Sequence, residues 1–294
     1  MKQGVLRKPD WIRTRAGGGS AWAETIKSVK TAGLHTVCEE ARCPNRGECW
    51  SSGTATFLIL GDVCTRGCRF CSVKRGDPSG KLDSDEPVRV SRAVSAMNLD
   101  YAVITSVTRD DLADGGASVF AETVTSLRAS DRKILSEVLI PDYGQDALKT
   151  VIDSGPAVIA HNIEVVEKLT PVMRHPAFTY EKSLDVISTI RKLGFKGPVK
   201  SSILLGLGEN SEDVASSIRH LHEAGCSMLV LGQYLQPSRD NPPPERYVSP
   251  QEFDKHRDMA LNSGFSSVVS KPLARTSYRA KEMFLSDNNG DSNG

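Results

Sequence analysis

Six of the chain's seven cysteines lie in one short stretch, where they form two groups of three. The first group has the spacing C-x4-C-x5-C, and the second has C-x3-C-x2-C in the run CTRGCRFC. In order, the groups are Cys38, Cys43 and Cys49, then Cys64, Cys68 and Cys71. Thiolates are soft ligands that suit zinc and iron–sulfur clusters. Three thiolates on a four-iron cluster leave one iron free to bind a substrate or a cofactor, so the missing fourth cysteine is itself informative.

Disulfides and structural zinc are the other uses of clustered cysteines. The basic start of the chain lacks the apolar part of a secretory signal, and no apolar run approaches the roughly 20 residues that span a bilayer. We therefore expect a cytoplasmic protein that does not insert into membranes, in which clustered thiols bind metal. Structural zinc usually takes four ligands, and each group is one short. His35 could complete a zinc site or simply be solvated, and the isolated Cys226 is interpreted as a small core residue.

The bulk composition is that of a globular protein. Of 294 residues, 39% are hydrophobic and 25% are charged, which allows one large α/β domain or two small ones. The formal net charge of +1 produces no strong field, so nothing points to nucleic acid or a membrane surface as a partner.

From Phe57 onward, short apolar runs alternate with helical patterns. Strands are predicted at residues 57–61, 101–107, 133–141, 156–162, 199–208, 228–235 and 266–272. Helices are predicted at residues 87–99, 117–129, 145–154, 183–193, 211–224 and 250–263. This alternation favours a parallel sheet in an α/β protein, here a partial, TIM-like (β/α) barrel. Active sites of such barrels lie at the C-terminal ends of the strands, which puts Cys64 at the mouth.

Three regions are expected along the chain. Residues 1–55 form an N-terminal extension that carries the first cysteine group and one short helix around residues 21–32. Residues 56–272 form the barrel. Residues 273–294 form a C-terminal segment, and its polar end, residues 286–294, is expected to be disordered.

The second cysteine group follows a first strand and has Phe70 before its last cysteine, and it resembles the motif of the radical S-adenosylmethionine superfamily. The resemblance implies that Cys64, Cys68 and Cys71 hold a [4Fe–4S] cluster whose open iron is chelated by S-adenosylmethionine (SAM). It further implies that one electron from the reduced cluster cleaves the sulfonium and yields a 5′-deoxyadenosyl radical. The protein's own task would be to position the cofactor and to exclude competing reactions.

The first cysteine group, in VCEEARCPNRGECW, resembles the auxiliary-cluster motif of the lipoyl synthase family. Other motifs of that family match from about residue 8 to about residue 284: KPDW, TSVTRDDLADGGA, HNIEVV, GLGE, LGQYLQPS, RYVSP and RTSY. The resemblance implies a second, auxiliary [4Fe–4S] cluster held by Cys38, Cys43, Cys49 and Ser277. The sequence departs from the family's pattern at four places, none of them a cluster cysteine. These are Thr108, Ser202, residues 241–244 and Thr276.

The resemblance also implies the reaction and its partners. The enzyme would insert sulfur at C6 and C8 of a protein-bound octanoyl-lysine, with the auxiliary cluster as the source and Ser277 as its labile ligand. An alkane C–H bond is far too weakly acidic for general-base catalysis, so a radical route is the plausible one. Implied partners are octanoylated lipoyl carrier domains (dehydrogenase E2 subunits, the glycine cleavage H protein), a low-potential electron donor such as ferredoxin or flavodoxin, and an iron–sulfur carrier.

Several side chains at strand ends are expected to contact SAM by their position in the family's motifs. They are Thr105, Ser106, His161, Asn162, Glu164, Glu209 and Gln236. Capping of a strand end is the alternative for each. His161 could equally be a core histidine whose hydrogen bonds are all made within the protein. Four basic residues beside the second cysteine group could steer an acidic carrier or a reductase, or could form a solvated face. They are Arg66, Arg69, Lys74 and Arg75.

Three other classes of protein stay open from the sequence. A methylthiotransferase would share the second cysteine group, but it usually has a larger N-terminal domain and a C-terminal RNA-binding module, and we expect neither here. In a non-catalytic zinc protein the same thiols would bind zinc, and the purified protein would be colourless instead of brown. An electron-transfer protein could use both clusters, but it would need neither a barrel nor an open iron.

Overall fold

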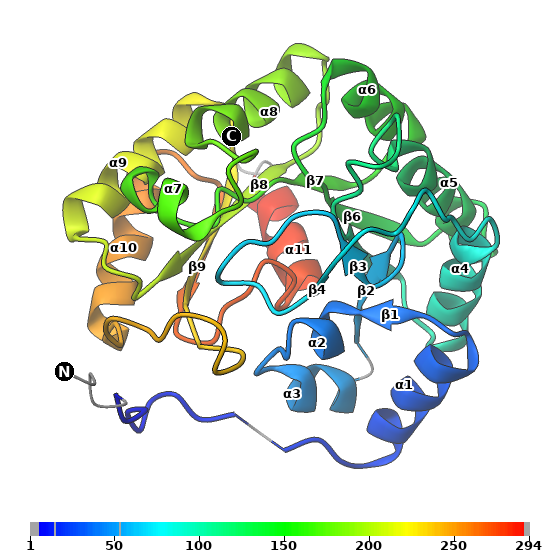
Figure 1. Cartoon of the computed structure of the whole chain (residues 1–294), viewed down its shortest axis with the longest axis horizontal. Helices are drawn as coiled ribbons and strands as arrows, with labels where there is room; N and C mark the ends of the chain where they lie inside the picture. Colours follow the sequence, from blue (N-terminus) through cyan, green and yellow to red (C-terminus); the bar gives the residue numbers. More distant parts are fainter. Residues whose placement is uncertain (1–5, 15, 53, 291–294) are drawn as a thin grey trace.

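The computed structural model describes residues 6–14, 16–52 and 54–290, and these residues form a partial barrel of strands surrounded by helices (Figure 1). Its main sheet has the order β1-β2-β5-β6-β7-β8-β9-β10. The parallel strands are β2 (Thr56–Ile59), β5 (Tyr101–Ser106), β6 (Leu135–Leu139), β7 (Val158–Ala160), β8 (Val199–Leu205), β9 (Met228–Gln233) and β10 (Ser267–Lys271). The short β1 (His35–Thr36) pairs antiparallel to β2 at one end of the sheet. The sequence prediction of a partial (β/α) barrel is confirmed.

An outer layer of helices covers the strands. It consists of α4 (Glu86–Ala96), α5 (Ala117–Arg128), α6 (Gln145–Ser154), α8 (Tyr180–Lys192), α9 (Ser211–Glu223) and α10 (Pro250–Asn262), with the short η1 (Glu167–Leu169) and α7 (Thr170–Met173) between β7 and α8. Local signals fix several boundaries. Capping boxes start two of the helices, α9 at Asn210 with Asp213, and α10 at Ser249 with Glu252. Each predicted strand and helix of the barrel is found within a few residues of its predicted position.

The strands are buried on both faces, as expected for a parallel sheet covered by helices. Phe57, Ile59 and Ile104 are fully buried in the main apolar core. The barrel interior also contains a buried polar group near the N-terminal ends of the strands. There Lys200 Nζ lies 2.9 Å from Glu137 Oε1, and Tyr101 Oη donates a 3.0 Å hydrogen bond to Glu137 Oε2.

The N-terminal extension contains more helix than predicted. Besides α1 (Ser20–Thr31) it has α2 (Val37–Glu40) and α3 (Arg46–Ser51). The prediction of a single short helix was therefore wrong. Helices of four and six residues are too short to leave a periodic pattern. They depend instead on a cap, in which Thr36 Oγ1 accepts from Glu39 N at 3.3 Å, and on packing of Trp50 against Trp22 with ring centroids 5.3 Å apart.

The C-terminal helix α11 (Ala280–Gly290) covers the barrel at the N-terminal ends of its strands, in the middle of the ring of elements in Figure 1. Its Met283 packs with Val158 and Met228, the first residues of β7 and β9. The predicted disorder from residue 286 was wrong as far as Gly290, and residues 291–294 lie outside the described part. The polar residues here are ordered by contacts with β10, such as the 3.3 Å hydrogen bond between the Ser286 and Ser267 hydroxyls.

A small parallel pair, β3 (Val63–Cys64) and β4 (Lys74–Arg75), frames the loop of the second cysteine group. This pair was not predicted, because two-residue strands leave no alternating pattern. It holds both ends of the loop at the mouth of the barrel.

Candidate active site

The second cysteine group lies at the C-terminal ends of the strands, as predicted. Cys64 ends β3, and Cys68 and Cys71 follow in the loop. All three line a cavity of about 380 Å³, together with the residues that end β5, β6 and β7. All seven cysteines are free thiols.

Main-chain amides point at two of these thiols. Arg66 N and Thr108 N each lie 3.4 Å from Cys64 Sγ, and His175 N lies 3.4 Å from Cys68 Sγ. Burial raises the pKa of Cys71 to about 12, and the neighbouring thiols add to the rise. Thiols packed this closely need a cationic centre to be deprotonated together, which fits an iron–sulfur cluster as their ligand.

The thiols suit a cluster by their spacing as well as by their chemistry. Among the described residues, no three Cys, His, Asp or Glu side chains are grouped so as to hold a single metal ion. A four-iron cluster binds each thiolate at a different iron, so its ligands do not have to converge on one point.

The first cysteine group lies in the N-terminal extension and meets the C-terminal segment. Cys38 is in α2, Cys49 is in α3, and Cys43 lies between them. The side chain of Asn45 donates a 2.7 Å hydrogen bond to Leu273 O, which ties the extension to the residues after β10. Ser277 is thereby brought to the first cysteine group.

A second cavity, of about 580 Å³, joins the two cysteine groups and is called the front cavity below. It is lined by Cys38, Cys43 and Ser277 on one side and by Cys71 on the other. Its remaining walls include apolar side chains of the strand ends and of the N-terminal extension, such as Ile12, Val37, Leu139, Leu204 and Leu235. One space therefore reaches both candidate cluster sites.

Among the described residues, four buried polar side-chain atoms beside the 380 Å³ cavity have no hydrogen-bond partner. They are Ser106 Oγ, His161 Nε2, Asn162 Oδ1 and Arg174 Nε. Buried polar groups are normally paired, so these atoms indicate a polar ligand in the cavity. A cofactor with amino, carboxylate and hydroxyl groups, such as SAM, fits this set.

His161 is fixed in one protonation state. Its Nδ1 lies 3.0 Å from Ile140 O, which can only accept, so Nδ1 carries the hydrogen. Burial, together with the charge of Arg174, lowers the pKa of His161 to about 4. The ring is therefore neutral near pH 7, and its Nε2 is a hydrogen-bond acceptor.

The remaining predicted contacts are distributed unevenly. Thr105, Asn162 and Glu164 line both cavities, whereas Gln236 lines the front cavity alone. Glu164 accepts a 3.0 Å hydrogen bond from Asn162 Nδ2 and has a positive φ of 67°. Glu209 is not brought to either cavity. Its two carboxylate oxygens accept from Gly206 N at 2.6 Å and Leu207 N at 2.9 Å, so it closes its own loop.

One residue of the site was not found from the sequence. Arg174 is buried, lines the 380 Å³ cavity, and leaves its Nε without a partner. Its Nη1 donates a 2.8 Å hydrogen bond to Ser183 Oγ. Arg174 follows α7, a helix of four residues that is too short to show a periodic pattern, so no local signal pointed to it.

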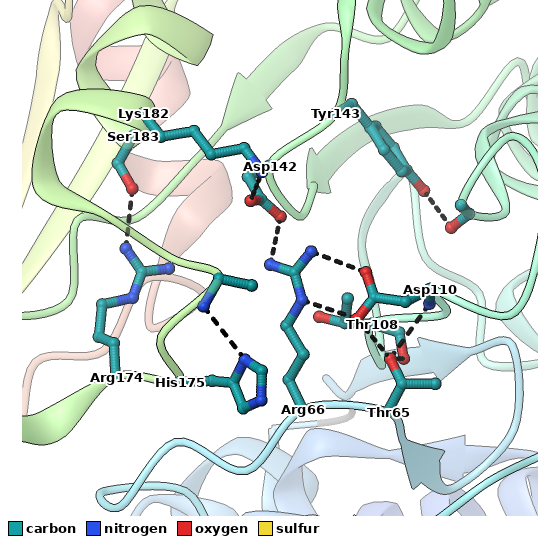
Figure 2. A network of polar contacts seen from close by, with 12 residues as sticks. Thr65, Arg66, Thr108, Asp110, Asp142, Tyr143, Arg174, His175, Lys182 and Ser183 are labelled. Carbon is teal, nitrogen blue, oxygen red and sulfur yellow. Dashed lines mark hydrogen bonds and ion pairs between the residues drawn. The ribbon is translucent and has the colours of Figure 1, made fainter. Parts of the chain in front are cut away.

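Arg66 corrects part of the prediction about the basic residues near the second cysteine group. It is buried, and Figure 2 shows its guanidinium between two carboxylates, donating at 2.7 Å to Asp110 Oδ1 and at 2.7 Å to Asp142 Oδ1. Lys182 Nζ lies 2.6 Å from the other oxygen of Asp142. Arg66 therefore anchors the cysteine loop across the mouth and is not available to a partner. The other three, Arg69, Lys74 and Arg75, are exposed.

Two departures from the family's pattern have a structural place. Thr108 uses its main chain, since its carbonyl accepts from Thr65 Oγ1 at 3.0 Å and its amide points at Cys64 Sγ. Asn241 Nδ2 donates at 2.9 Å to both Arg69 O and Cys71 O. Asn241 thus fastens the cysteine loop from the far side.

Comparison with known proteins assigns the chain. The family model of the radical SAM superfamily matches residues 58–221. The lipoyl synthase of Halorhodospira halophila is 46% identical over 98% of this chain and 87% of its own length. The chain belongs to the lipoyl synthase family. Two further lipoyl synthases support this assignment. That of Frankia alni is 48% identical over 95% of this chain and 85% of its own length, and that of Caldicellulosiruptor bescii is 46% identical over 94% of this chain and 95% of its own length.

The lipoyl synthase assignment decides between the classes that the sequence left open. The chain is a radical SAM enzyme, and lipoyl synthases use two [4Fe–4S] clusters and SAM.

Solved structures support the fold alone. The hydrogenase maturase HydG has a TM-score of 0.58 at 14% identity, over 91% of this chain and 67% of that one. Methylornithine synthase (PylB) has a TM-score of 0.53 at 13% identity, over 88% of this chain and 80% of that one. No described helix of this lipoyl synthase family member is long and apolar enough to cross a membrane.

Proposed function

We propose that this chain inserts sulfur at C6 and C8 of a protein-bound octanoyl-lysine, and that the sulfur comes from a cluster held by Cys38, Cys43, Cys49 and Ser277. The observation that carries this proposal is the front cavity. A single space lined by Cys71 of one group and by Cys38, Cys43 and Ser277 of the other lets one substrate carbon meet both centres.

The two cysteine groups have different tasks in this proposal. Cys64, Cys68 and Cys71 hold the cluster that binds SAM. When bound, the two clusters and SAM supply a primary carbon radical that can abstract hydrogen from an alkane and a sulfur source next to it. Everything else is positioning by the chain, which holds the reacting carbon in place and keeps water out.

The 380 Å³ cavity is the proposed SAM site. His161 Nε2 and Asn162 Oδ1 accept hydrogen bonds from the cofactor's amino or hydroxyl groups, and Ser106 Oγ serves as a further polar contact. Arg174, which is buried and has a free Nε, pairs with the cofactor's carboxylate. Thr105 and Glu164 lie between this cavity and the front cavity and align cofactor and substrate. Gln236 contacts the substrate side, and Glu209 supports its loop without touching the cofactor.

The front cavity is the proposed octanoyl site. Its apolar walls stabilise an alkyl chain by removing it from water, at about 0.8 kcal/mol for each buried CH₂. Lys8, Ile12 and Thr14 of the N-terminal extension line the same cavity and close it on one side. The extension (residues 1–55) and the C-terminal segment (residues 273–294) thus complete an active site whose remainder is the barrel (residues 56–272).

The proposed partners are those that membership of the lipoyl synthase family implies. They are octanoylated lipoyl domains of dehydrogenase E2 subunits and of the glycine cleavage H protein, a low-potential donor such as ferredoxin or flavodoxin, and an iron–sulfur carrier. The exposed Arg69, Lys74 and Arg75 beside the mouth would steer an acidic partner. Seven free thiols suit a reducing compartment, and we propose the cytoplasm.

An anaerobic assay tests the proposal. Cluster-loaded protein, a reductant, SAM and an octanoyl-lysine peptide are combined, and mass spectrometry follows the peptide. A gain of two sulfurs is expected. A protein with both clusters intact that forms no dithiolated peptide would overturn the substrate assignment.

A further inference from the structure

A third cavity opens on the other side of the first cysteine group. It has a volume of about 680 Å³, and we call it the rear cavity. Cys38, Cys43, Cys49 and Ser277 all line it, and Cys38, Cys43 and Ser277 also line the front cavity. The proposed auxiliary cluster would therefore form a wall between the two cavities.

The two cavities extend toward opposite ends of the strands, and Thr56 and Val103 line both of them. The front cavity is lined by C-terminal strand ends, for example Leu139 of β6 and Leu204 of β8. The rear cavity is lined by Asn98, Asp100 and Tyr101, at the start of β5. Access to the first cysteine group from the rear therefore does not pass through the substrate site.

The rear cavity is larger than a cluster requires. An eight-atom iron–sulfur core displaces about 240 Å³ if each atom takes the roughly 30 Å³ of a water molecule. The remaining space extends to the surface between α11 and the loop before β5, where Lys281 and Glu282 lie. The site is thus open to solvent-borne ions on this side.

Charged pairs at the rim are weak enough to open. Lys281 Nζ and Asp100 Oδ2 lie 2.7 Å apart, with about half of each side chain exposed at 49% and 59%. Glu282 is 66% exposed and is paired with Arg279 at 3.3 Å. Exposed ion pairs contribute at most about 1 kcal/mol each, so solvent competes with them readily.

We propose that the rear cavity is the port through which iron and sulfide leave and re-enter the auxiliary site. The proposal rests on the function proposed above, in which this cluster is consumed and must be rebuilt. Rebuilding is a ligand exchange. An iron–sulfur carrier delivers an assembled [4Fe–4S]²⁺ cluster, and Cys38, Cys43, Cys49 and Ser277 replace the carrier's thiolates on its irons. The protons of the incoming thiol and hydroxyl groups pass to the departing carrier thiolates, so no iron or sulfide changes its oxidation state. The separate opening lets this exchange occur while the substrate remains in the front cavity.

The port is tested by narrowing its rim without touching a cluster ligand. The double variant Lys281→Trp/Glu282→Trp fills the rim, and Lys281→Ala/Glu282→Ala widens it. Lys149→Trp/Asp153→Trp, at an exposed ion pair on the outer helix α6, is the matched control. Holoenzyme with SAM and the octanoyl-lysine peptide bound, but without reductant, is exposed to an iron chelator. The readouts are iron released per chain and the iron–sulfur absorbance.

The port predicts that tryptophan at the rim slows iron release several-fold, that alanine speeds it, and that the control matches the wild type. Filling the front cavity with SAM and peptide should leave the rate unchanged. The proposal is overturned if the rim variants and the wild type release iron equally, or if ligands in the front cavity block release. The measurement needs no turnover, so it is independent of whether the cluster donates sulfur. Failure of the proposed function would instead appear as dithiolated peptide formed without loss of auxiliary iron.

Discussion

Tyr278 Oη donates a 2.8 Å hydrogen bond to Glu48 Oε1, across 230 positions of sequence. Tyr278 follows Ser277, and Glu48 precedes Cys49, so this bond joins the two segments that supply the proposed auxiliary ligands. Arg279 Nη2 lies 3.8 Å from the same carboxylate oxygen. The link stands at the wall of the rear cavity, where it holds Ser277 against the cysteines.

Removing this hydrogen bond should loosen the auxiliary site. In Tyr278→Phe the ring remains but the donor is lost, which costs about 0.5–1.5 kcal/mol. We expect a small fall in melting temperature and faster loss of auxiliary iron to a chelator. Tyr247→Phe, at a half-buried tyrosine in the loop before α10, serves as the control. If Tyr278→Phe kept iron as long as the wild type did, the link would have no part in holding the site.

Changing the hardness of the fourth ligand should separate cluster binding from sulfur transfer. In Ser277→Cys a soft thiolate replaces a harder oxygen, so the iron at that corner should be held more firmly. We expect the usual iron and sulfide content but little dithiolated peptide, measured by metal analysis and mass spectrometry. Full lipoyl formation by this variant would show that a labile oxygen ligand is not needed.

Removing Arg66, which anchors the cysteine loop, should lower both the stability of the fold and the amount of cluster bound. Arg66→Gln leaves the buried carboxylate of Asp142 with Lys182 alone, and removal of one partner of a buried pair costs about 3 kcal/mol or more. We expect a clearly lower melting temperature and less iron bound by Cys64, Cys68 and Cys71. Arg69→Gln, in the same loop but exposed, should change neither. Equal melting temperatures for the two variants would contradict the anchor.

The neutral state of His161 predicts how SAM binding depends on pH. Because burial lowers its pKa from 6.5 to about 4, Nε2 stays an acceptor from pH 8 down to pH 6. We expect the affinity for SAM to be constant over that range by isothermal titration. A loss of affinity centred near pH 6.5 would mean that the ring titrates normally.

The same depressed pKa has a consequence for stability. The unfolded histidine takes up a proton below about pH 6.5, and the folded one does so only near pH 4, so this group's contribution is complete above pH 6.5 and is lost as the pH falls toward 4. The slope of melting temperature against pH in that window should therefore be smaller in His161→Gln.

The sequence predicted the barrel well because its elements are long enough to show periodicity. The helix predicted at residues 145–154 is α6 without any shift. The elements that were missed are short or ordered by distant contacts. Helices α2 and α3 depend on Thr36 and on Trp50 packing, and the end of α11 depends on β10.

The site divides in the same way. The cysteine groups were visible as spacing, whereas Ser277 was found only through the resemblance to lipoyl synthases, since a lone serine carries no signal. Arg174 and the burial of Arg66 depend on where loops far apart in the sequence meet, which no local pattern encodes. Glu209 shows the converse case, because its strand-end position left a SAM contact and capping both open, and its carboxylate accepts hydrogen bonds from its own loop.

Sulfur labelling tests the central claim most directly. The clusters are assembled with a heavy isotope of sulfide, excess sulfide is removed, and one turnover is run on the octanoyl-lysine peptide under argon. Both sulfurs of the lipoyl product should carry the heavy isotope, with one auxiliary cluster lost for each product formed. Product that contains only natural-abundance sulfur, while the labelled clusters stay intact, would contradict the account.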